Sequence, residues 1–241
     1  MDYQNAQIAE IYDLINTRAA DTDFYLDLAG PRACSVLDLG CGTGLLCRAL
    51  AERGHQVSGV DPAAAMLAVA RTKPPAERVE WIECSAQNYR AQTRFDLIVM
   101  TGHALQLLLN DADALAVFET MRGHLNESGR VAFETRNPRL DWAGEWASLP
   151  PIAYKVPGGQ LLETLDVTSR DGEFISFQTS YRFPSTTLTT NSTLRFPSRE
   201  HVEALLARSG LLVRDVFGDW NAGPFEATRS REIIFVAESA G

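Results

Sequence analysis

The sequence has few of the features that mark membrane, secreted or metal-binding proteins. No apolar run approaches the length of a membrane span, and the first residues have no basic region followed by an apolar core. The four cysteines, Cys34, Cys41, Cys47 and Cys84, show neither paired metal-ligand spacing nor a disulfide-rich pattern. We therefore expect a cytoplasmic protein with reduced thiols, no membrane contact and no metal.

Clusters of basic residues are also missing. The chain has 22 Lys and Arg against 31 Asp and Glu, which gives a net charge of −9. Nucleic-acid binding needs grouped cations that neutralise phosphates, so this charge disfavours a nucleic-acid substrate. The chain has 241 residues, 45% of them hydrophobic. That is enough for one α/β domain with a sizeable core and an insertion.

The most informative segment is Val-Leu-Asp-Leu-Gly-Cys-Gly-Thr-Gly at residues 36–44. An apolar run over 35–39 enters a glycine turn, and residues 45–53 have the pattern of a helix, so the segment predicts strand, turn and helix. Glycines tolerate positive φ in such a turn and let a ligand lie against bare backbone. We therefore expect a ligand at the carboxyl end of this strand.

The spacing of the glycines narrows the choice of ligand. The dinucleotide fingerprint has its third glycine three residues after the second, which leaves room for a pyrophosphate. Here Leu45 occupies that place and the third glycine is Gly44, so a nucleoside without phosphates fits better. Asp61 ends the next apolar run, and its carboxylate is suited to accept hydrogen bonds from both ribose hydroxyls.

Three segments in this order resemble the class I S-adenosylmethionine-dependent methyltransferases: the glycine segment, Gly-Val-Asp-Pro at residues 59–62, and Phe-Asp-Leu-Ile-Val-Met at residues 95–100. The resemblance covers about residues 1–138 and, more weakly, 198–237. It implies an α/β fold with a Rossmann-like, doubly wound, mostly parallel sheet of seven strands. It also implies S-adenosyl-L-methionine as the cofactor.

The cofactor contacts that we expect combine this resemblance with the ends of the predicted strands. The strand over 79–84 leads to Ser85, where the family usually has an acidic residue, and the strand over 95–100 opens into Thr101. For Met66, a place in the core is an equal alternative. The expected cofactor-binding set is Asp38, Gly40, Cys41, Gly42, Gly44, Asp61, Pro62, Met66, Ser85, Ala86, Gln87, Thr101 and Gly102.

Two side chains are candidates for a general base. His103 follows the strand over 95–100, and histidine titrates near neutrality; helix capping or a hydrogen bond near the cofactor are the alternatives. Tyr12 lies on an amphipathic helix predicted over about 4–16. In resembling methyltransferases such helices cross the cofactor pocket and a tyrosine often faces the methionine part; simple packing is the alternative. A base is optional, because an amine acceptor needs only to arrive uncharged.

The pattern changes between residues 150 and 197. Short segments alternate in polarity and are separated by Pro-Gly-Gly, Asp-Gly and Pro-Ser, which predicts an inserted antiparallel sheet of three or four strands. We therefore divide the chain into a cofactor-binding core, 1–149 and 198–241, and an insertion, 150–197. Helices within residues 1–30 are expected over the pocket. The insertion either roofs the substrate site or forms the surface of a homodimer.

Substrate contacts are expected from Arg136, Trp142 and Trp146. Arg136 follows the predicted strand over 130–135, where it can pair with a substrate carboxylate or, alternatively, with a neighbouring acid. The two tryptophans precede the insertion and are expected in an apolar pocket roof, together with Tyr181 and Phe183.

The predicted activity is methyl transfer to nitrogen or oxygen of a small molecule. One alternative is a protein that binds the cofactor as a sensor or scaffold without turnover. Another is a nicotinamide-dependent oxidoreductase, which the missing pyrophosphate glycine disfavours. The identity of the acceptor is not encoded in any residue pattern that we recognise.

Overall fold

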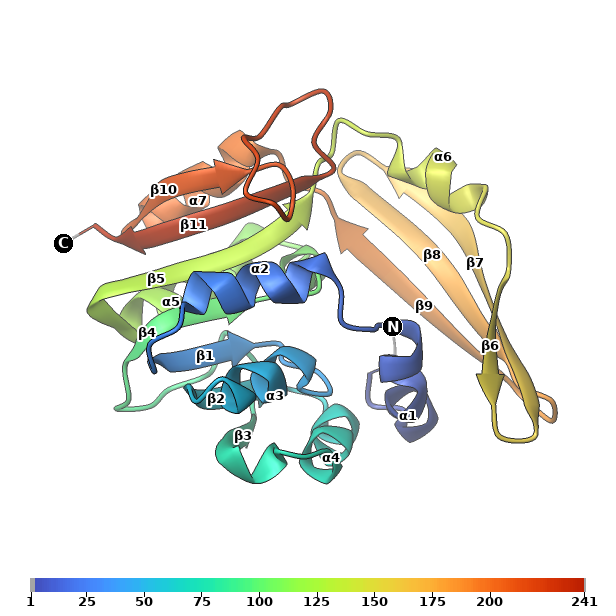
Figure 1. The fold of residues 1–241 in the computed structure, drawn as a ribbon. Helices are drawn as coiled ribbons and strands as arrows, with labels where there is room; N and C mark the ends of the chain where they lie inside the picture. Colours follow the sequence, from blue (N-terminus) through green and yellow to red (C-terminus); the bar gives the residue numbers. More distant parts are fainter. Residues whose placement is uncertain (1–2, 241) are drawn as a thin grey trace.

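The computed structural model describes residues 3–240, which form two β-sheets and the helices around them (Figure 1). The helices are α1 (Ala6–Ile15), α2 (Ala20–Ala29), α3 (Leu45–Glu52), α4 (Ala64–Thr72), α5 (Asp111–Gly123), α6 (Trp142–Ala147) and α7 (Arg199–Arg208), with the short 3-10 helices η1 (Ala76–Arg78) and η2 (Ala104–Leu107). The strands are β1 (Ser35–Leu39), β2 (Gln56–Asp61), β3 (Val79–Glu83), β4 (Phe95–Met100), β5 (Leu125–Arg136), β6 (Ile152–Val156), β7 (Gly159–Asp171), β8 (Phe174–Arg182), β9 (Thr187–Arg195), β10 (Leu211–Phe217) and β11 (Glu232–Ser239).

The larger sheet, sheet A, has seven strands in the order β10-β11-β5-β4-β1-β2-β3. Strands β3, β2, β1, β4 and β5 are paired in parallel, whereas β11 is antiparallel to both β5 and β10. Helices α2 and α3 lie on one face of this sheet and α5 and α7 on the other (Figure 1). The predicted Rossmann-like, mostly parallel fold is thereby confirmed.

The central strands are apolar on both faces because helices cover both faces. Val36 of β1 is buried among α2 and α3, while its neighbour Leu37 is buried in the core that includes α5 and α7. A strand that is buried on both sides reads as a continuous apolar run rather than an alternating one. This is why the segments over 35–39 and 95–100 could be assigned from sequence.

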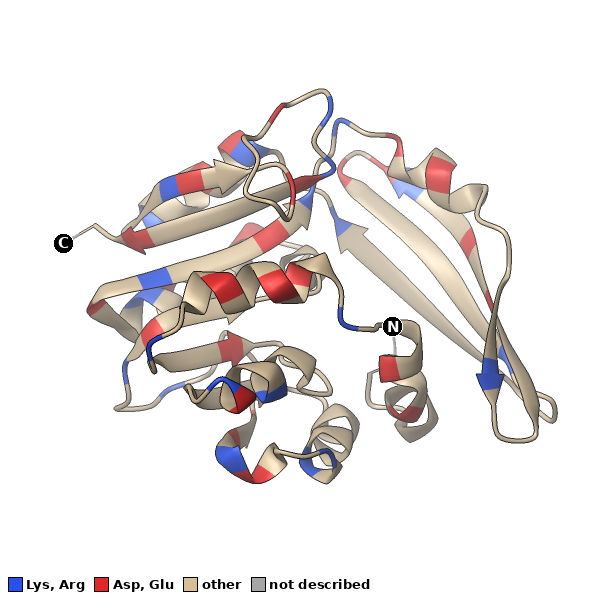
Figure 2. Cartoon of the chain, in the orientation of Figure 1, with Lys and Arg blue, Asp and Glu red and all other residues tan. Residues whose placement is uncertain are grey.

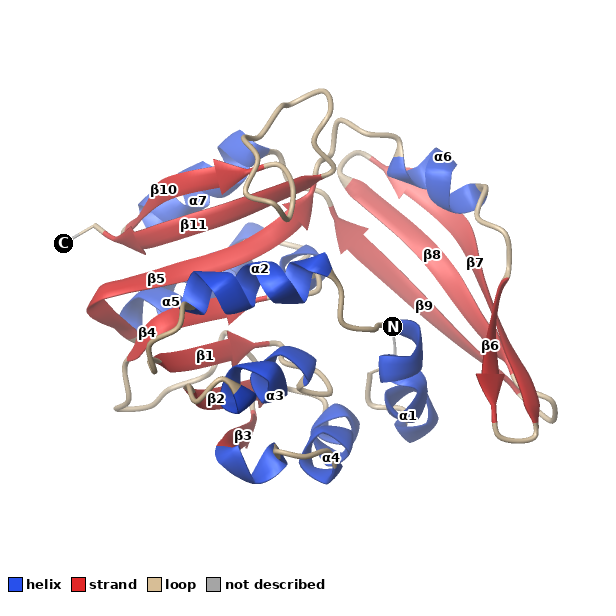
Figure 3. Cartoon of the chain, viewed as in Figure 1, coloured by secondary structure: helices blue, strands red, loops and turns tan. Residues whose placement is uncertain are grey.

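The smaller sheet, sheet B, is antiparallel in the order β6-β7-β8-β9 (Figure 3). Along β8 the residues alternate: Phe177 and Tyr181 are buried, whereas Ser176 and Gln178 on the opposite face are half-buried. Helix α6 packs on the buried face near one end of the sheet, and α1 packs on it near the other. Sheet B therefore has an inner face with its own apolar contacts.

Four further details that the sequence predicts are corrected: a helix over 111–125, its termination by Gly129, a first turn of the helix after Asp61 that includes Pro62, and a loop around the two tryptophans. The helix expected over 111–125 ends at Gly123, and Leu125 already belongs to β5. Gly129 does not end a helix; it lies in β5, where a Cβ would approach the Phe95 carbonyl oxygen to 2.8 Å. Pro62 precedes α4 and its N-cap, Ala63, instead of lying in the first turn. The tryptophan segment expected as a loop forms the short helix α6.

Charged residues are spread over both sheets and their helices, with Lys and Arg interspersed among Asp and Glu (Figure 2). Within the part of the chain that the structure describes, none of the helices is both long and apolar enough to cross a membrane. The same residues include no group of three or more His, Cys, Asp or Glu arranged to hold a metal ion.

Candidate active site

A cleft with two adjoining lobes lies at the carboxyl ends of β1, β2 and β4. The first lobe has a volume of about 340 Å³ and the second about 440 Å³, sizes typical of ligand pockets. Both lobes are lined by Tyr12, Gly40, Gly42, Thr101 and Gly102. In an open parallel sheet this edge is where ligands bind, so the position agrees with the expectation from the glycine turn.

The glycine turn exposes its backbone to both lobes. Gly40 and Gly42 have φ of 79° and 55°, values that side chains rarely adopt. The N–H groups of Gly40 and Cys41 donate to the Val60 carbonyl, which fixes the turn against β2. Gly44, which we expected to contact the cofactor, lines neither lobe.

Gly44 has a different local reason to be glycine. It is the N-cap of α3 with φ of 74°, and a Cβ there would lie 2.2 Å from the Trp81 ring. The third glycine therefore allows α3 to pack closely against β3. Its place in the motif serves packing, while Gly40 and Gly42 face the cleft.

Asp61 lines the second lobe at the end of β2. Its Oδ2 accepts a hydrogen bond from the Gly42 N–H and its Oδ1 accepts one from the Ala63 N–H, both at 2.8 Å. Burial raises the pKa of this carboxyl, although the two N–H donors oppose that shift. Each carboxylate oxygen can accept more than one hydrogen bond, so Asp61 is fixed by the backbone and can still bind a ligand.

Asp38 lines the first lobe and is only 1% exposed. Its Oδ2 accepts a hydrogen bond from the Cys47 thiol at 3.3 Å, whereas Oδ1 has no partner among residues 3–240. Burial raises the pKa of Asp38 to about 7. A buried polar atom without a partner is rare in proteins, which makes Oδ1 of Asp38 a candidate contact for a bound ligand.

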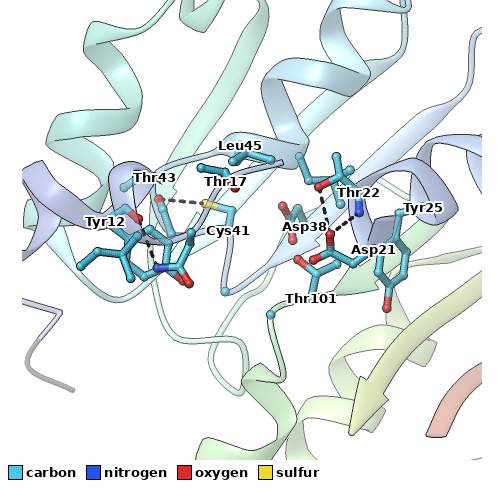
Figure 4. Close-up of a pocket in the computed structure, with 16 residues that line it drawn as sticks. Tyr12, Thr17, Asp21, Thr22, Tyr25, Asp38, Cys41, Thr43, Leu45 and Thr101 are labelled. Atoms are coloured by element: carbon cyan, nitrogen blue, oxygen red, sulfur yellow. Dashed lines mark hydrogen bonds between the residues drawn. The ribbon is translucent and has the colours of Figure 1, made fainter. Parts of the chain in front are cut away.

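The first lobe is acidic. Asp21 and Thr101 lie beside Asp38 in this lobe (Figure 4), and no Lys, Arg or His is among the described residues that line it. A cation is favoured in such a surrounding because it pairs with carboxylates that are otherwise desolvated. The first lobe therefore suits a positively charged ligand group.

Comparison with known proteins shows what the chain is similar to. A model described as a methyltransferase domain matches residues 36–129, which run from β1 into β5. An S-adenosylmethionine-dependent methyltransferase from Clostridium acetobutylicum has the same fold, with a TM-score of 0.79 over 98% of each chain at 19% identity. The matched domain and the shared fold support a class I S-adenosylmethionine-dependent methyltransferase.

Two relatives align over most of this methyltransferase. The cypemycin N-terminal methyltransferase of a Streptomyces species is 24% identical, with 85% of this chain and 82% of the relative covered. The dTDP-3-amino-3,6-dideoxy-alpha-D-glucopyranose N,N-dimethyltransferase of Streptomyces fradiae is 27% identical, with 75% and 71% covered. Both matches extend well beyond the residues matched by the domain model.

The lining of the cleft fits S-adenosylmethionine. The cofactor has a ribose with two adjacent hydroxyls and a methionine ammonium group at the opposite end. Asp61 offers carboxylate oxygens in the second lobe, and Asp38 offers its unpartnered Oδ1 in the acidic first lobe. The bare backbone at Gly40 and Gly42 lies between them. The two lobes therefore match the two ends of the cofactor in chemistry.

Most of the residues expected at the cofactor line the cleft. Met66 is 2% exposed and also packs against Ala9 of α1, so it belongs to the core and to the pocket wall at once. Besides Asp38, Asp61 and the residues shared by both lobes, the expected residues that line a lobe are Cys41, Pro62, Met66, Ser85, Ala86 and Gln87.

Sequence analysis missed part of the lining, most of it from segments without a motif. The first lobe includes residues of the α1–α2 connection and α2, and the second includes η2 and the residues before α1. The signal available was the expectation that helices within residues 1–30 cover the pocket. The missed residues in these segments are Tyr3, Gln4, Ile15, Asn16, Thr17, Asp21, Thr22, Tyr25, Leu107 and Leu108.

Tyr12 and His103 differ in their positions. Tyr12 lines both lobes, and burial raises its pKa, so its hydroxyl keeps the proton at neutral pH. His103 lines neither lobe; its Nε2 lies 2.8 Å from Oε2 of Glu232 on β11. The His103 backbone N–H donates to Oε1 of Glu134 at 2.6 Å.

Glu134 and Glu232 were not foreseen from the sequence. Glu134 is 1% exposed, accepts a hydrogen bond from the Tyr25 hydroxyl, and has a pKa raised by burial. It is the acid that follows the apolar Val131–Phe133 stretch, and an acid in a strand buried on both faces is a signal for a polar network. The network links α2, the His103 turn and sheet A.

The two tryptophans expected in a pocket roof lie away from both lobes. Trp142 and Trp146 are 5% and 8% exposed and pack with Phe177 and Phe196 between α6 and sheet B. Neither tryptophan lines a lobe, because the α6 turn directs both rings into this local core. Tyr181 is likewise buried, in the contact between α1 and sheet B, and Phe183 packs against the same contact.

Arg136 lies beside these tryptophans at the end of β5. Its guanidinium is 5.6 Å from the Trp142 ring and 5.3 Å from the Trp146 ring, and Nη1 donates to Gln106 Oε1 at 2.8 Å. Burial lowers its pKa. None of the salt bridges among residues 3–240 includes this side chain. Arg136 lines neither lobe, so it is not a cofactor residue.

Proposed function

We propose that this methyltransferase transfers a methyl group from S-adenosylmethionine to nitrogen or oxygen of a small molecule, with an amino group as the preferred acceptor. The observation that carries the proposal is the pair of carboxylates, Asp61 and Asp38, in adjoining lobes on either side of a bare glycine turn. The preference for an amine is supported by the two relatives, whose names describe N-methylation of a peptide terminus and of an amino sugar.

The chain's own residues hold the reactants. When bound, S-adenosylmethionine supplies an activated methyl group. Asp61 accepts hydrogen bonds from the ribose, Ser85 and Gln87 are available to adenine, and Asp38 binds the ammonium group. Holding an acceptor in line with the methyl group can supply roughly 7–11 kcal/mol of the barrier. Most of the catalytic effect is therefore expected from positioning.

His103 is the candidate that we propose as the general base. Glu232 accepts a hydrogen bond from the Nε2 side of the ring, which leaves Nδ1 as the atom that takes a proton. His103 follows Gly102, a residue of both lobes, so it is next in sequence to the lining of the cleft. Tyr12 contributes through its hydroxyl as a hydrogen-bonding group, since burial raises its pKa.

Arg136 is proposed as a contact for a negatively charged part of the acceptor. Its charge is desolvated, and among residues 3–240 it hydrogen-bonds only to the neutral Gln106 side chain. A buried cation gains most from a partner of opposite charge. Trp142 and Trp146 support this role indirectly, because their rings hold the guanidinium in place.

We also propose the division of the chain into a methyltransferase core, 1–149 and 198–241, and an insertion, 150–197, that closes over the acceptor. Support comes from α1, which contacts the second lobe through Met66 and sheet B through Leu161 and Tyr181. A surface for homodimers is the alternative role of the insertion. Four free cysteines and interspersed charges (Figure 2) support a cytoplasmic enzyme for small molecules rather than nucleic acids.

A direct test is methyl transfer from labelled S-adenosylmethionine to a panel of small acceptors in matched amino and hydroxyl forms, with product mass as the readout. We expect a mass increase of one or two methyl groups on amino members. Methylation of hydroxyl members alone would overturn the preference for amines. No methylation of any member, together with tight cofactor binding, would favour a sensor or scaffold.

A further inference from the structure

The Cys47 side chain is fully buried on α3, directly beside Asp38. Its Sγ lies 3.3 Å from Oδ2 of Asp38. Gly59 on β2 is the register partner of Asp38, and a Cβ at Gly59 would lie 3.0 Å from the sulfur atoms of both Cys41 and Cys47. The glycine therefore leaves the space that the thiol needs to reach the carboxylate.

Among residues 3–240, no cation lines the first lobe or acts on Asp38 in place of this donor. The titratable groups that act on Asp38 or line the lobe with it are acids, thiols and phenols: Cys41, Cys47, Tyr12, Asp21, Tyr25, Asp61 and Glu134. Burial and the charges of Asp61 and Glu134 raise the pKa of Asp38, whereas the hydrogen bond from Cys47 lowers it. Among the groups of residues 3–240 that act on Asp38, the thiol is thus the one that favours the ionised carboxylate.

We infer that Cys47 is a positioning residue for cofactor binding: its thiol donates to Oδ2 of Asp38 and leaves Oδ1 free for the ammonium group of S-adenosylmethionine. The inference rests on the proposed function, because it assigns that ammonium group to the first lobe. Cys47 itself lines neither lobe, so it acts only through Asp38.

The thiol has two consequences for binding. It restricts rotation of the carboxyl group, so that the same oxygen faces the lobe in each molecule. It also stabilises the negative charge of Asp38 before the cofactor arrives. Fewer protons are then released from Asp38 when the cofactor binds. Loss of the donor should therefore weaken binding more at low pH than at high pH.

The test is calorimetric titration with S-adenosylhomocysteine between pH 5.5 and 8.5, for the wild type and the variants Cys47→Val and Cys47→Ser. Valine keeps most of the volume without a donor, and serine keeps a donor. Cys34→Ala serves as the matched control, because Cys34 lies before β1 and lines neither lobe.

We expect Cys47→Val to bind about 10-fold more weakly at pH 7, as for loss of a hydrogen bond to a charged group. The pH below which affinity falls should move upward, and titrations in buffers of different ionisation enthalpy should show more protons released. Cys47→Ser and Cys34→Ala should match the wild type in pH dependence.

An affinity and pH profile of Cys47→Val equal to those of the wild type would overturn the inference. So would a loss of affinity in Cys47→Val that is the same at every pH, because that points to packing alone. If the wild type itself did not bind S-adenosylhomocysteine, the proposed cofactor site would fail first. The wild-type titration therefore separates the two failures.

Discussion

The cleft of sheet A and the inner face of sheet B differ in what lines them, polar groups at the cleft and packed aromatic side chains on sheet B. At the cleft, turns with positive φ expose backbone, and a buried carboxylate keeps a polar atom unpaired: Oδ1 of Asp38 has no hydrogen-bond partner among residues 3–240. On sheet B, aromatic side chains such as Trp146 and Phe177 fill the space by packing on one another. A glycine turn therefore marks a site through its backbone geometry, whereas aromatic content marks only a buried surface.

Helix α1 joins these two regions. Ile8 and Ile11 pack on sheet B, and Tyr12 lines both lobes. Asp13 accepts hydrogen bonds from the Thr43 hydroxyl, from Lys73 Nζ at 2.5 Å and from Arg48 Nη2 at 3.2 Å. The helix is thus attached to the glycine turn, α3 and α4 by a single carboxylate.

The largest effect that we predict separates stability from cofactor binding. Trp146→Ala should lower the free energy of unfolding by about 3–5 kcal/mol, because it leaves a cavity between α6 and sheet B. Its affinity for S-adenosylhomocysteine should stay within about twofold of the wild type. Denaturant unfolding and calorimetry measure the two quantities, and Trp146→Phe is the milder control. A selective loss of cofactor binding would show that sheet B shapes the cofactor cleft.

Asp61→Ala should show the reverse behaviour. Removing the carboxylate deletes the hydrogen bonds to the ribose, and binding of S-adenosylhomocysteine should weaken about 100-fold. Asp61→Asn should lie between, since its amide oxygen still accepts from one of the two backbone N–H groups, while its NH2 group faces the other. Unchanged affinity in the alanine variant, with an intact fold by circular dichroism, would remove the ribose role.

Asp38 should make the protein without cofactor less stable as pH rises. Its pKa in the folded state, about 7, is above the ordinary value of 3.8, so its contribution to stability is full below pH 4 and is lost as pH rises through 7. Asp38→Asn should raise the free energy of unfolding at pH 8 by about 1–3 kcal/mol, with a smaller gain at pH 5. A gain equal at both pH values would argue against ionisation as the cause.

Asp13→Asn should have the smallest effect. Weaker attachment of α1 should speed dissociation of S-adenosylhomocysteine about fivefold in stopped-flow measurements. Burial alone would raise the pKa of Asp13, but hydrogen bonds from Lys73 and Thr43 hold it below its usual value. The attachment is therefore complete at neutral pH and is lost only in acid. A dissociation rate equal to that of the wild type would leave α1 without a role in retention.

The sequence predicts those features of this protein that depend on residues close together in the chain. The strand at 35–39, the glycine turn, Asp61 and the strand at 95–100 are local patterns, and the structure has the strands at the predicted bounds. Ser198 also caps α7 as its position indicates. These features need no knowledge of distant residues.

The remaining parts depend on contacts between distant segments. The ring of His103 is fixed by Glu232, 129 residues further along the chain, and no spacing rule connects the two. Likewise, the sequence predicts substrate contacts for Trp142 and Trp146. It does not show that α6, a helix of 6 residues, turns both rings inward. The lack of a partner for Oδ1 of Asp38 can be recognised only in the folded structure, where α3 and β2 enclose this oxygen.

The most direct test of the central claim is calorimetric titration of the wild-type protein with S-adenosylhomocysteine, with NAD as the control ligand. We predict one-to-one binding of S-adenosylhomocysteine and no heat from NAD, because the turn has Leu45 where a pyrophosphate would need glycine. Binding of NAD, or no binding of S-adenosylhomocysteine, would contradict the assignment of the two lobes to this cofactor.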